Sequence, residues 1–155
     1  MLRLTFENPV FRAYVIAASV MVLKMMGMSW LTVYRMMKVN GGYRNPEDAQ
    51  SGLVNRAPHA SQLDRNEYVE RIRRIHQNDG ENVPLFLIAG LLFVFTDPSV
   101  LLAQLLFYGY AVSRILHFAA YATARSHELR ATCWTIGSLI VLGISVATLA
   151  QAFGS

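Results

Sequence analysis

Three polar side chains, Arg74, Asn78 and Glu81, recur where the most charged stretch of the chain meets an apolar run, residues 83–95. Their spacing of i, i+4 and i+7 puts them on one face of a helix. As a helix the apolar run covers about 20 Å, whereas a bilayer core is about 30 Å thick. A spanning helix must therefore include part of the charged stretch. Polar groups at that depth are costly without partners or water, so we expect this face to line a polar site inside a membrane protein.

A second polar stripe lies in the next apolar segment, where Arg114, His117 and Tyr121 are spaced at i, i+3 and i+7. Each of these residues could be satisfied separately by a neighbour, and for His117 alone that is the simpler interpretation. An arginine, a histidine and a tyrosine on one face of a membrane helix are harder to explain in this way. We expect the second stripe to meet the first at one site.

The residues of these stripes are rich in arginine and poor in paired acids. Guanidinium groups bind carboxylates through forked hydrogen bonds, and nearby cations favour the thiolate form of a thiol. Glu81 could neutralise an arginine such as Arg114, or bind a ligand ammonium. A ligand with several carboxylates and one amine would fit. Lys24 could face the bundle interior or a carboxylate, but a lysine that snorkels or is reached by water, without a chemical role, is the simpler interpretation.

Several other chemistries lack their usual patterns. The chain has no Ser-His-Asp order, phosphate-binding loop or HExxH pattern. Its sole cysteine, Cys133, excludes a cysteine-based zinc site and is expected to be a buried structural thiol, with a reactive thiol as the alternative. Metal binding by His76, His117 and His127 is a weak idea, so we expect no metal. The basic residues flank apolar segments, which favours contact with anionic lipid over nucleic acid.

The composition is that of a membrane protein. Of the 155 residues, 54% are hydrophobic and 15% are charged, against about 25% charged residues in soluble domains. Four segments are long enough for a helix to cross a bilayer, provided that the second includes its charged start. They cover roughly residues 10–34, 74–95, 100–122 and 131–153. The sequence thus predicts one domain, residues 1–155, with an all-α fold: an integral membrane four-helix bundle.

Local signals predict where these helices begin and bend. The second helix should rise from about Asp64 and loosen or kink near Pro84. Asn45, which precedes a proline and two acids, is typical of a helix start inside the long polar link. Residues 96–99 form a turn signal in which Asp97 or Ser99 could cap the third helix.

The basic residues also predict an orientation. They gather in two links, residues 35–74 and 125–130, while the N-terminal region has only Arg3 and Arg12 and the C-terminus has none. By the positive-inside rule both basic links are cytoplasmic and both chain ends lie across the membrane. Both polar stripes then lie in the cytoplasmic half of the bundle. The endoplasmic reticulum and a bacterial inner membrane are equally compatible with this topology.

Four separated motifs occur in the order typical of one family. They are Glu70-Arg71-x-x-Arg74-x-His76-x-Asn78-Asp79-x-Glu81-Asn82 with Pro84-Leu85-Phe86, Asn45-Pro46-Glu47-Asp48-Ala49, Lys24-Met25, and Arg114-Ile115-x-His117-x-x-Ala120-Tyr121. Over nearly its whole length the chain resembles the MAPEG family, membrane-associated proteins of eicosanoid and glutathione metabolism. This resemblance implies a homotrimer of four-helix subunits, with glutathione bound between neighbouring subunits.

The resemblance also implies roles for individual residues. Arg130 would stabilise the glutathione thiolate and is the expected catalytic group. The residues expected to hold glutathione are Arg35, Arg73, Arg74, Asn78, Glu81, His117 and Tyr121. For Arg114, a purely structural pairing with Glu81 is at least as good an interpretation as ligand contact.

Positions that differ between branches favour the microsomal glutathione transferase branch of the family. Ala131 and Trp134 stand where the prostaglandin E synthase branch has a serine and a tyrosine, and Gln77 stands where it has an arginine. The expected activity is conjugation of glutathione to lipophilic electrophiles, or reduction of lipid hydroperoxides, with the apolar co-substrate entering from the bilayer. Two alternatives are a glutathione-dependent isomerase of a lipid endoperoxide and a non-enzymatic lipid-presenting protein.

Overall fold

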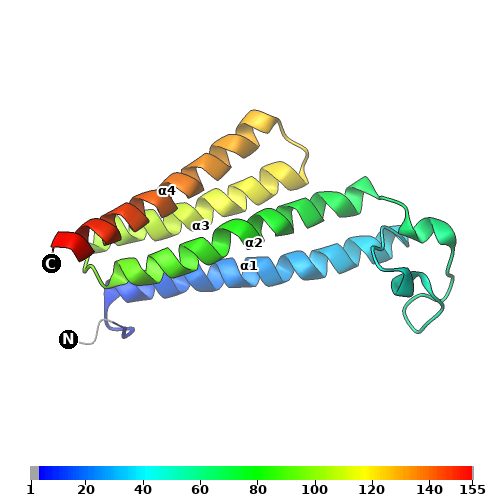
Figure 1. Cartoon of the computed structure of the whole chain (residues 1–155), viewed down its shortest axis with the longest axis horizontal. Coiled ribbons are helices and arrows are strands. Elements are labelled where there is room, and N and C mark those ends of the chain that lie inside the picture. The colour runs from blue at the N-terminus through cyan, green and yellow to red at the C-terminus, as the bar shows by residue number, and fades with distance from the viewer. Residues whose placement is uncertain (1–3, 155) are drawn as a thin grey trace.

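The computed structural model describes residues 4–154 and is built from four long helices lying side by side (Figure 1). They are α1 (Pro9–Val39), α2 (Glu67–Val94), α3 (Val100–Ala122) and α4 (His127–Gly154). Two short 3-10 helices, η1 (Pro46–Ala49) and η2 (Ala60–Leu63), lie in the α1–α2 link. Residues 4–154 contain no strand. The predicted all-α fold with four long helices is therefore confirmed.

The helices pack as a four-membered bundle in which α1 and α4 each contact α2 and α3. Its apolar core is held by aromatic rings from three helices. Phe86 and Tyr110 stack with their ring centroids 4.0 Å apart. Tyr14 and Phe93 each meet the ring of Phe107 edge-on, at 5.6 and 6.2 Å between centroids. These interlocked rings fix the separation of the helices, so that polar side chains nearer the α1–α2 link are held at set distances.

Helix starts follow local capping chemistry, with two differences from expectation. Ser99 caps α3 by accepting a hydrogen bond from the Leu102 backbone N–H at 3.4 Å. The long second helix begins at Glu67, after the cap Asn66, and not at Asp64. Asn45 does stand at the N-cap position of a helix start, but only the short 3-10 helix η1 follows, and its side chain makes no cap bond; its Nδ2 donates to the Asp48 carboxylate at 3.2 Å.

Helix α2 continues without interruption through its internal proline, Pro84. It is as long as α4, at 28 residues, but it differs in composition. By length and hydropathy, α1, α3 and α4 could each cross a membrane, whereas α2 does not meet the same measure. The physical reason is the charged first half of α2, the stretch in which the polar site was expected.

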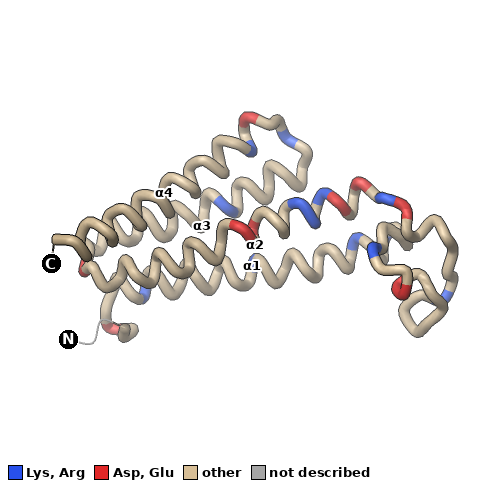
Figure 2. The backbone as a smooth tube through the Cα atoms, viewed as in Figure 1, with Lys and Arg blue, Asp and Glu red and all other residues tan. Residues whose placement is uncertain are grey.

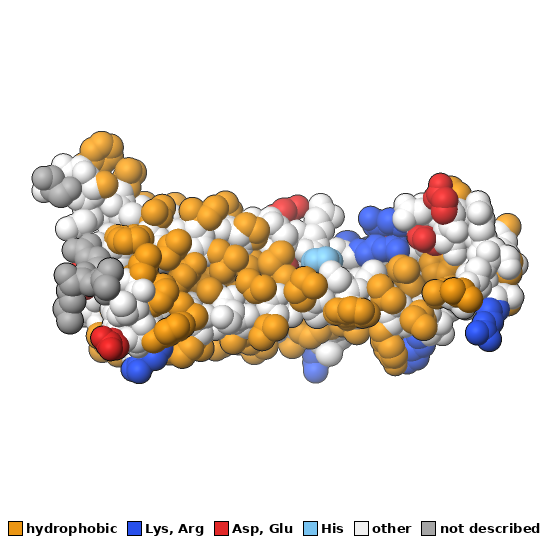
Figure 3. All heavy atoms as spheres, turned by 90° about the horizontal axis from the view of Figure 1, so that it is seen from below, with side chains coloured by type: hydrophobic (Ala, Val, Ile, Leu, Met, Phe, Trp, Pro, Cys, Tyr) orange, Lys and Arg blue, Asp and Glu red, His pale blue; other side chains and the backbone are white. Residues whose placement is uncertain are grey.

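Basic residues gather at one end of the bundle (Figure 2), whereas apolar surface runs along its length (Figure 3). Figure 2 shows lysine and arginine concentrated toward the end that carries the α1–α2 link and the α3–α4 turn. Figure 3 shows hydrophobic side chains spread over much of one face of the helices. The exposed apolar side chains include Trp30, Ile88, Leu101, Leu105 and Leu139. An apolar exterior of this extent on four long helices is what a membrane protein requires.

The α1–α2 link is a folded loop tied to both helices. The amide of Gln62, fully buried, exchanges hydrogen bonds with the Asn55 amide at 2.7 and 3.1 Å and donates to Asn40 at 2.9 Å. Arg44 donates to one carboxylate oxygen of Glu70 at 2.8 Å, and Arg73 donates to the other. One carboxylate on α2 therefore anchors the loop.

The Glu70 carboxylate should make loop anchoring dependent on pH. Partial burial acts to raise its pKa, but hydrogen bonds from Arg44 and Arg73 hold the pKa below its ordinary value. A lowered pKa in the folded state stabilises the fold above the unfolded value of about 4.3, and that contribution is lost as the pH falls through the folded pKa. At pH 7 we expect Glu70→Gln to unfold more easily than wild type by about 1 kcal/mol.

The measurement is unfolding of both proteins in detergent micelles from pH 7 down to pH 3. The difference between them should shrink toward zero at the acidic end, because the wild-type carboxylate is then protonated. Glu47→Gln, at an exposed position of the same loop, is the matched control. A difference that stays constant with pH would contradict this account of Glu70.

Candidate functional site

An acidic residue lies on the buried face of α2. Ile72, Ile75, Val83 and Phe86 form that face at helical spacing, each with no exposed surface, and Asp79 occupies the position between them. Asp79 is itself fully buried. Sequence reasoning did not select it as a site residue. The available signal was a carboxylate on an otherwise apolar helical stripe, which membrane or core helices tolerate only with a partner.

Asp79 joins three helices. Its Oδ2 pairs with the Lys24 ammonium of α1, and its Oδ1 accepts a hydrogen bond from Arg114 Nη2 of α3 at 2.9 Å. Lys24 therefore faces a carboxylate in the bundle, which was one of its two interpretations, and does not snorkel. The suggested pairing of Arg114 with Glu81 is wrong. Asp79 and Glu81 are two residues apart, which corresponds to a rotation of about 200° around the helix. Glu81 therefore lies on the exposed side of α2 when Asp79 faces the core.

Arg114 has a second partner on α2. The same Nη2 that binds Asp79 also donates to the side-chain carbonyl of Asn78. Arg114 is 1% exposed, whereas Asn78 is only half-buried. A buried ion network thus reaches one of the residues expected to hold the ligand.

A second cluster forms where α2, α3 and α4 meet near the charged end. The rings of His117 and Tyr121 pack edge to face with their centroids 5.8 Å apart. The Arg130 guanidinium carbon lies 4.5 Å from the centre of the Tyr121 ring. Arg74 interacts with Tyr121 as well, while it pairs with Glu67. Four of the predicted site residues are therefore brought together by this tyrosine.

Two other predicted residues lie where α1 and α2 pack together, Arg35 on α1 and Arg73 on α2. Arg35 is buried over the Tyr68 ring at 4.0 Å and donates to the Tyr68 carbonyl at 2.7 Å. Arg73 pairs with Glu70 and donates to the Met36 sulfur at 3.1 Å. A polar pocket of about 570 Å³ opens beside them. Its lining residues are Ser29, Thr32, Arg44, Arg73, Arg74, His76 and Gln77.

Glu81 stands apart from both groups. It is exposed and accepts a hydrogen bond from the Gln77 amide at 3.2 Å, one turn earlier on the same helix. Within one chain the predicted site residues thus divide between two faces of α2. Arg74 alone belongs to both groups, since it lines the polar pocket and contacts Tyr121.

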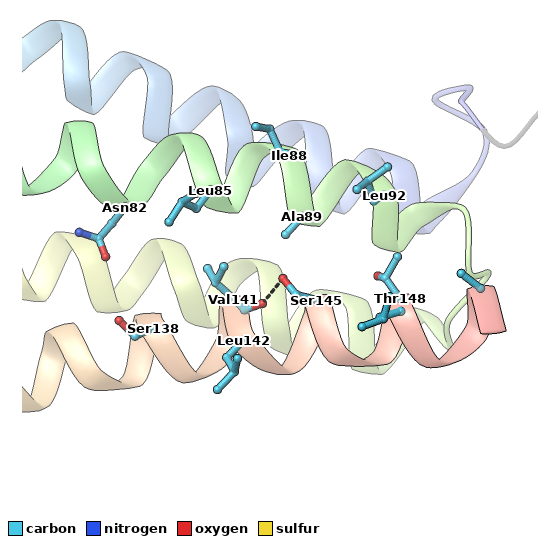
Figure 4. Close-up of a pocket in the computed structure, with 12 residues that line it drawn as sticks. Asn82, Leu85, Ile88, Ala89, Leu92, Ser138, Val141, Leu142, Ser145 and Thr148 are labelled. Atoms are coloured by element: carbon cyan, nitrogen blue, oxygen red, sulfur yellow. Dashed lines mark hydrogen bonds between the residues drawn. The ribbon is translucent and has the colours of Figure 1, made fainter. Parts of the chain in front are cut away.

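A second pocket, also of about 570 Å³, is apolar and lies between α2 and α4 (Figure 4). Leu85 and Leu92 of α2 and Val141 and Leu142 of α4 line it, and Asn82 stands at one end. The Ser145 hydroxyl, on the same wall, is turned back to the Val141 carbonyl at 2.8 Å. Because its polar groups are few, this pocket suits an apolar chain or a packed helix and not an ionic ligand.

The site contains guanidinium groups that could bind an anion. Among residues 4–154, no group of three His, Cys, Asp or Glu side chains could hold a metal ion. Cys133 is a free, buried thiol, which agrees with its expected structural role. Arg74 and Arg130, both near Tyr121, present guanidinium groups that can bind a carboxylate or stabilise a thiolate.

Comparison with known proteins places these observations in a family. The family model described as MAPEG matches residues 14–150. Mouse microsomal glutathione S-transferase 1 is 34% identical over 149 residues, which covers 96% of this chain and 94% of that protein. The pig protein of the same name is 35% identical over 145 residues, or 92% of this chain and 91% of that protein. Human prostaglandin E synthase is 27% identical over 149 residues, which covers 96% of this chain and 94% of that protein.

The ion network predicts a large difference between two neighbouring acids of α2. Asp79→Ala would leave Lys24 and Arg114 buried without their shared carboxylate, which should cost about 3–5 kcal/mol of stability. Glu81→Ala removes an exposed carboxylate and should change stability by less than about 0.5 kcal/mol. Unfolding by SDS titration from mixed micelles measures both. Equal losses for the two variants would show that Asp79 does not hold the bundle together.

Proposed function

The chain belongs to the MAPEG family, and on that premise we propose that it is a membrane-bound glutathione transferase. It binds glutathione, holds the thiol as a thiolate, and conjugates it to lipophilic electrophiles or uses it to reduce lipid hydroperoxides. The relatives named for glutathione transfer match more than nine-tenths of the chain. The observation that carries the proposal most is the grouping of Arg74, His117 and Arg130 around Tyr121.

In this proposal Arg74 and Arg130 have different roles. Arg74 binds a glutathione carboxylate, because its guanidinium can donate two parallel hydrogen bonds to it. Arg130 lies beside the sulfur and lowers the thiol pKa, since a nearby cation favours the anionic form. The thiol proton leaves to water, the thiolate sulfur bonds to the electrophilic carbon, and the leaving group departs with its electron pair. His117 and Tyr121 hold the peptide between these charges.

The site is proposed to be completed by a neighbouring copy of the chain. Arg35 of α1 and Arg73 of α2 lie where these two helices meet, whereas His117, Tyr121 and Arg130 lie on the α3 and α4 side. One glutathione molecule could contact both groups if the first came from one subunit and the second from its neighbour in a homotrimer. The apolar pocket between α2 and α4 is available for a lipophilic substrate or for subunit packing.

The placement of charge supports a site that opens to the cytoplasm. The basic α1–α2 link and α3–α4 turn lie at one end of the bundle (Figure 2), and basic links stay on the cytoplasmic side. Glutathione would then enter from the cytoplasm and apolar substrates from the bilayer. The protein is proposed to be a multi-pass membrane protein of the endoplasmic reticulum or of a bacterial inner membrane.

Kinetics with purified protein, glutathione and 1-chloro-2,4-dinitrobenzene test the transferase proposal. We expect Arg130→Ala to lower kcat/KM about 10²- to 10³-fold, the usual cost of removing one group that stabilises developing charge. In wild type the pH–rate profile should show an ionisation well below the free-thiol value of about 8.5, and Arg130→Ala should move it upward. Arg125→Ala, at an exposed position of the α3–α4 turn that precedes Arg130, is the matched control. Wild-type turnover no faster than the uncatalysed reaction would reject the proposal.

A second candidate is a glutathione-dependent isomerase of a lipid endoperoxide, because human prostaglandin E synthase matches 96% of this chain. Gln77 and Ala131 weigh against it, since the branch with that activity has an arginine and a serine at these positions. We expect incubation with a prostaglandin endoperoxide and glutathione to yield no excess of the isomerised product over the spontaneous mixture. Enrichment of that product without consumption of glutathione would favour the isomerase. Failure of wild type to bind glutathione in calorimetry would favour a non-enzymatic lipid-binding role.

A further inference from the structure

We propose that Asp79 is a positioning residue that acts through Arg114 on Asn78 and leaves Asn78 only its N–H donors to offer a ligand. This inference rests on the proposed function, in which Asn78 contacts glutathione. It assigns a part in binding to a fully buried ion network that lies behind the site. It also specifies what Asn78 recognises: a hydrogen-bond acceptor, such as a carboxylate or a peptide carbonyl.

The orientation of the Asn78 amide follows from the chemistry of its partner. A guanidinium has only donors, so the side-chain atom of Asn78 that faces Arg114 Nη2 must be the oxygen. With Oδ1 held there, Nδ2 points elsewhere. Asn78 is half-buried, so its NH₂ group is the part of the side chain left for a ligand. Without Arg114, rotation of the amide by 180° would present the oxygen and repel an acceptor.

Arg114 in turn is held by Asp79. The carboxylate accepts from Arg114 Nη2 on one oxygen and from the Lys24 ammonium on the other, so that α1, α2 and α3 are joined at one depth. Lys24 and Arg114 are 9% and 1% exposed at their side chains. Long basic side chains lose much rotational freedom when they are fixed in this way. A full negative charge on Asp79 is what keeps Arg114 turned toward α2.

Other hydrogen-bond acceptors are close to Arg114 along α3 if the charge of Asp79 is removed. Its Nε has no hydrogen-bond partner among residues 4–154, and neither do the Tyr110 hydroxyl and His117 Nδ1. All three residues are buried and lie at i, i+4 and i+7 on one face of α3. Both the hydroxyl and a neutral imidazole nitrogen can accept a hydrogen bond. Neutralising Asp79 should let the guanidinium turn along its own helix and release Asn78.

The test uses the full-length protein in detergent micelles, with glutathione as the probe. Asp79→Asn keeps the shape and removes the charge, and we expect it to weaken glutathione binding about tenfold in calorimetry while kcat at saturating glutathione changes less than threefold. Asn78→Ala should weaken binding to a similar extent. If Asp79 acts through Asn78, the double variant should bind glutathione no more weakly than Asn78→Ala alone.

Tyr14→Phe is the matched structural control. It removes a hydrogen bond of 2.8 Å from the Tyr14 hydroxyl to the Leu87 carbonyl, which also joins α1 to α2 but lies away from Asn78. We expect lower stability and unchanged glutathione affinity. Lys24→Met, which removes the second cation that fixes the Asp79 carboxylate, is the second variant if Asp79→Asn does not fold. Lys24→Met should weaken glutathione binding less than Asp79→Asn does. Combined with Asn78→Ala, it should again cause no further loss of affinity.

The outcomes separate this inference from the proposed function. Wild type that binds glutathione, with Asp79→Asn binding it equally well, would overturn the positioning role alone. Additive losses in the double variant would do the same, because they would mean that Asp79 acts independently of Asn78. Wild type that does not bind glutathione would overturn the proposed function and this inference with it.

Discussion

The bundle depends on one carboxylate shared by two cations in its interior. Asp79 of α2 meets Lys24 of α1 and Arg114 of α3, and all three side chains are removed from water. Buried charges are stable only with good pairing geometry, because each charge has lost its hydration. Ion pairs and hydrogen bonds with its partners must offset that loss. Three of the four helices are therefore restricted in rotation and depth at the same point. The half-buried Asn78 extends that restriction to the surface.

Around this network the molecule separates packing from chemistry along its length. Toward the α2–α3 turn, stacked and edge-on rings such as those of Phe86 and Phe107 fill the bundle. Toward the α1–α2 link and the α3–α4 turn, arginines line the helix faces and meet at Tyr121. A rigid apolar half is suited to hold a cationic half in a fixed arrangement, and anion binding gains most from donors that do not have to reorganise. The folded loop anchored at Glu70 limits movement on the α1 side.

Sequence reasoning was accurate where a residue's neighbours along the chain decide its environment. The third helix and the cap at Ser99 both follow from short patterns. It was wrong where two acids of the same helix competed for one arginine. Glu81 fits the motif spacing, whereas Asp79 lies on the apolar stripe of α2. Which of the two acids pairs with Arg114 depends on the face that α2 turns toward α3. The helix start predicted at Asn45 is present, but it opens only a short 3-10 helix, and the Asn45 side chain makes no cap bond.

The sequence by itself determined the all-α class, the long polar link and the family, because hydropathy, helical spacing and motif order are properties of the chain alone. It also identified the polar residues from which a site would be chosen. The tertiary structure decided which of them meet: Arg74, His117 and Arg130 converge on Tyr121, whereas Arg35 and Arg73 lie where α1 and α2 pack together. That division could not be read from the sequence, because helical periodicity gives the faces of each helix but not the rotation at which helices pack. Packing of the apolar stripes and pairing of the buried charges set that rotation.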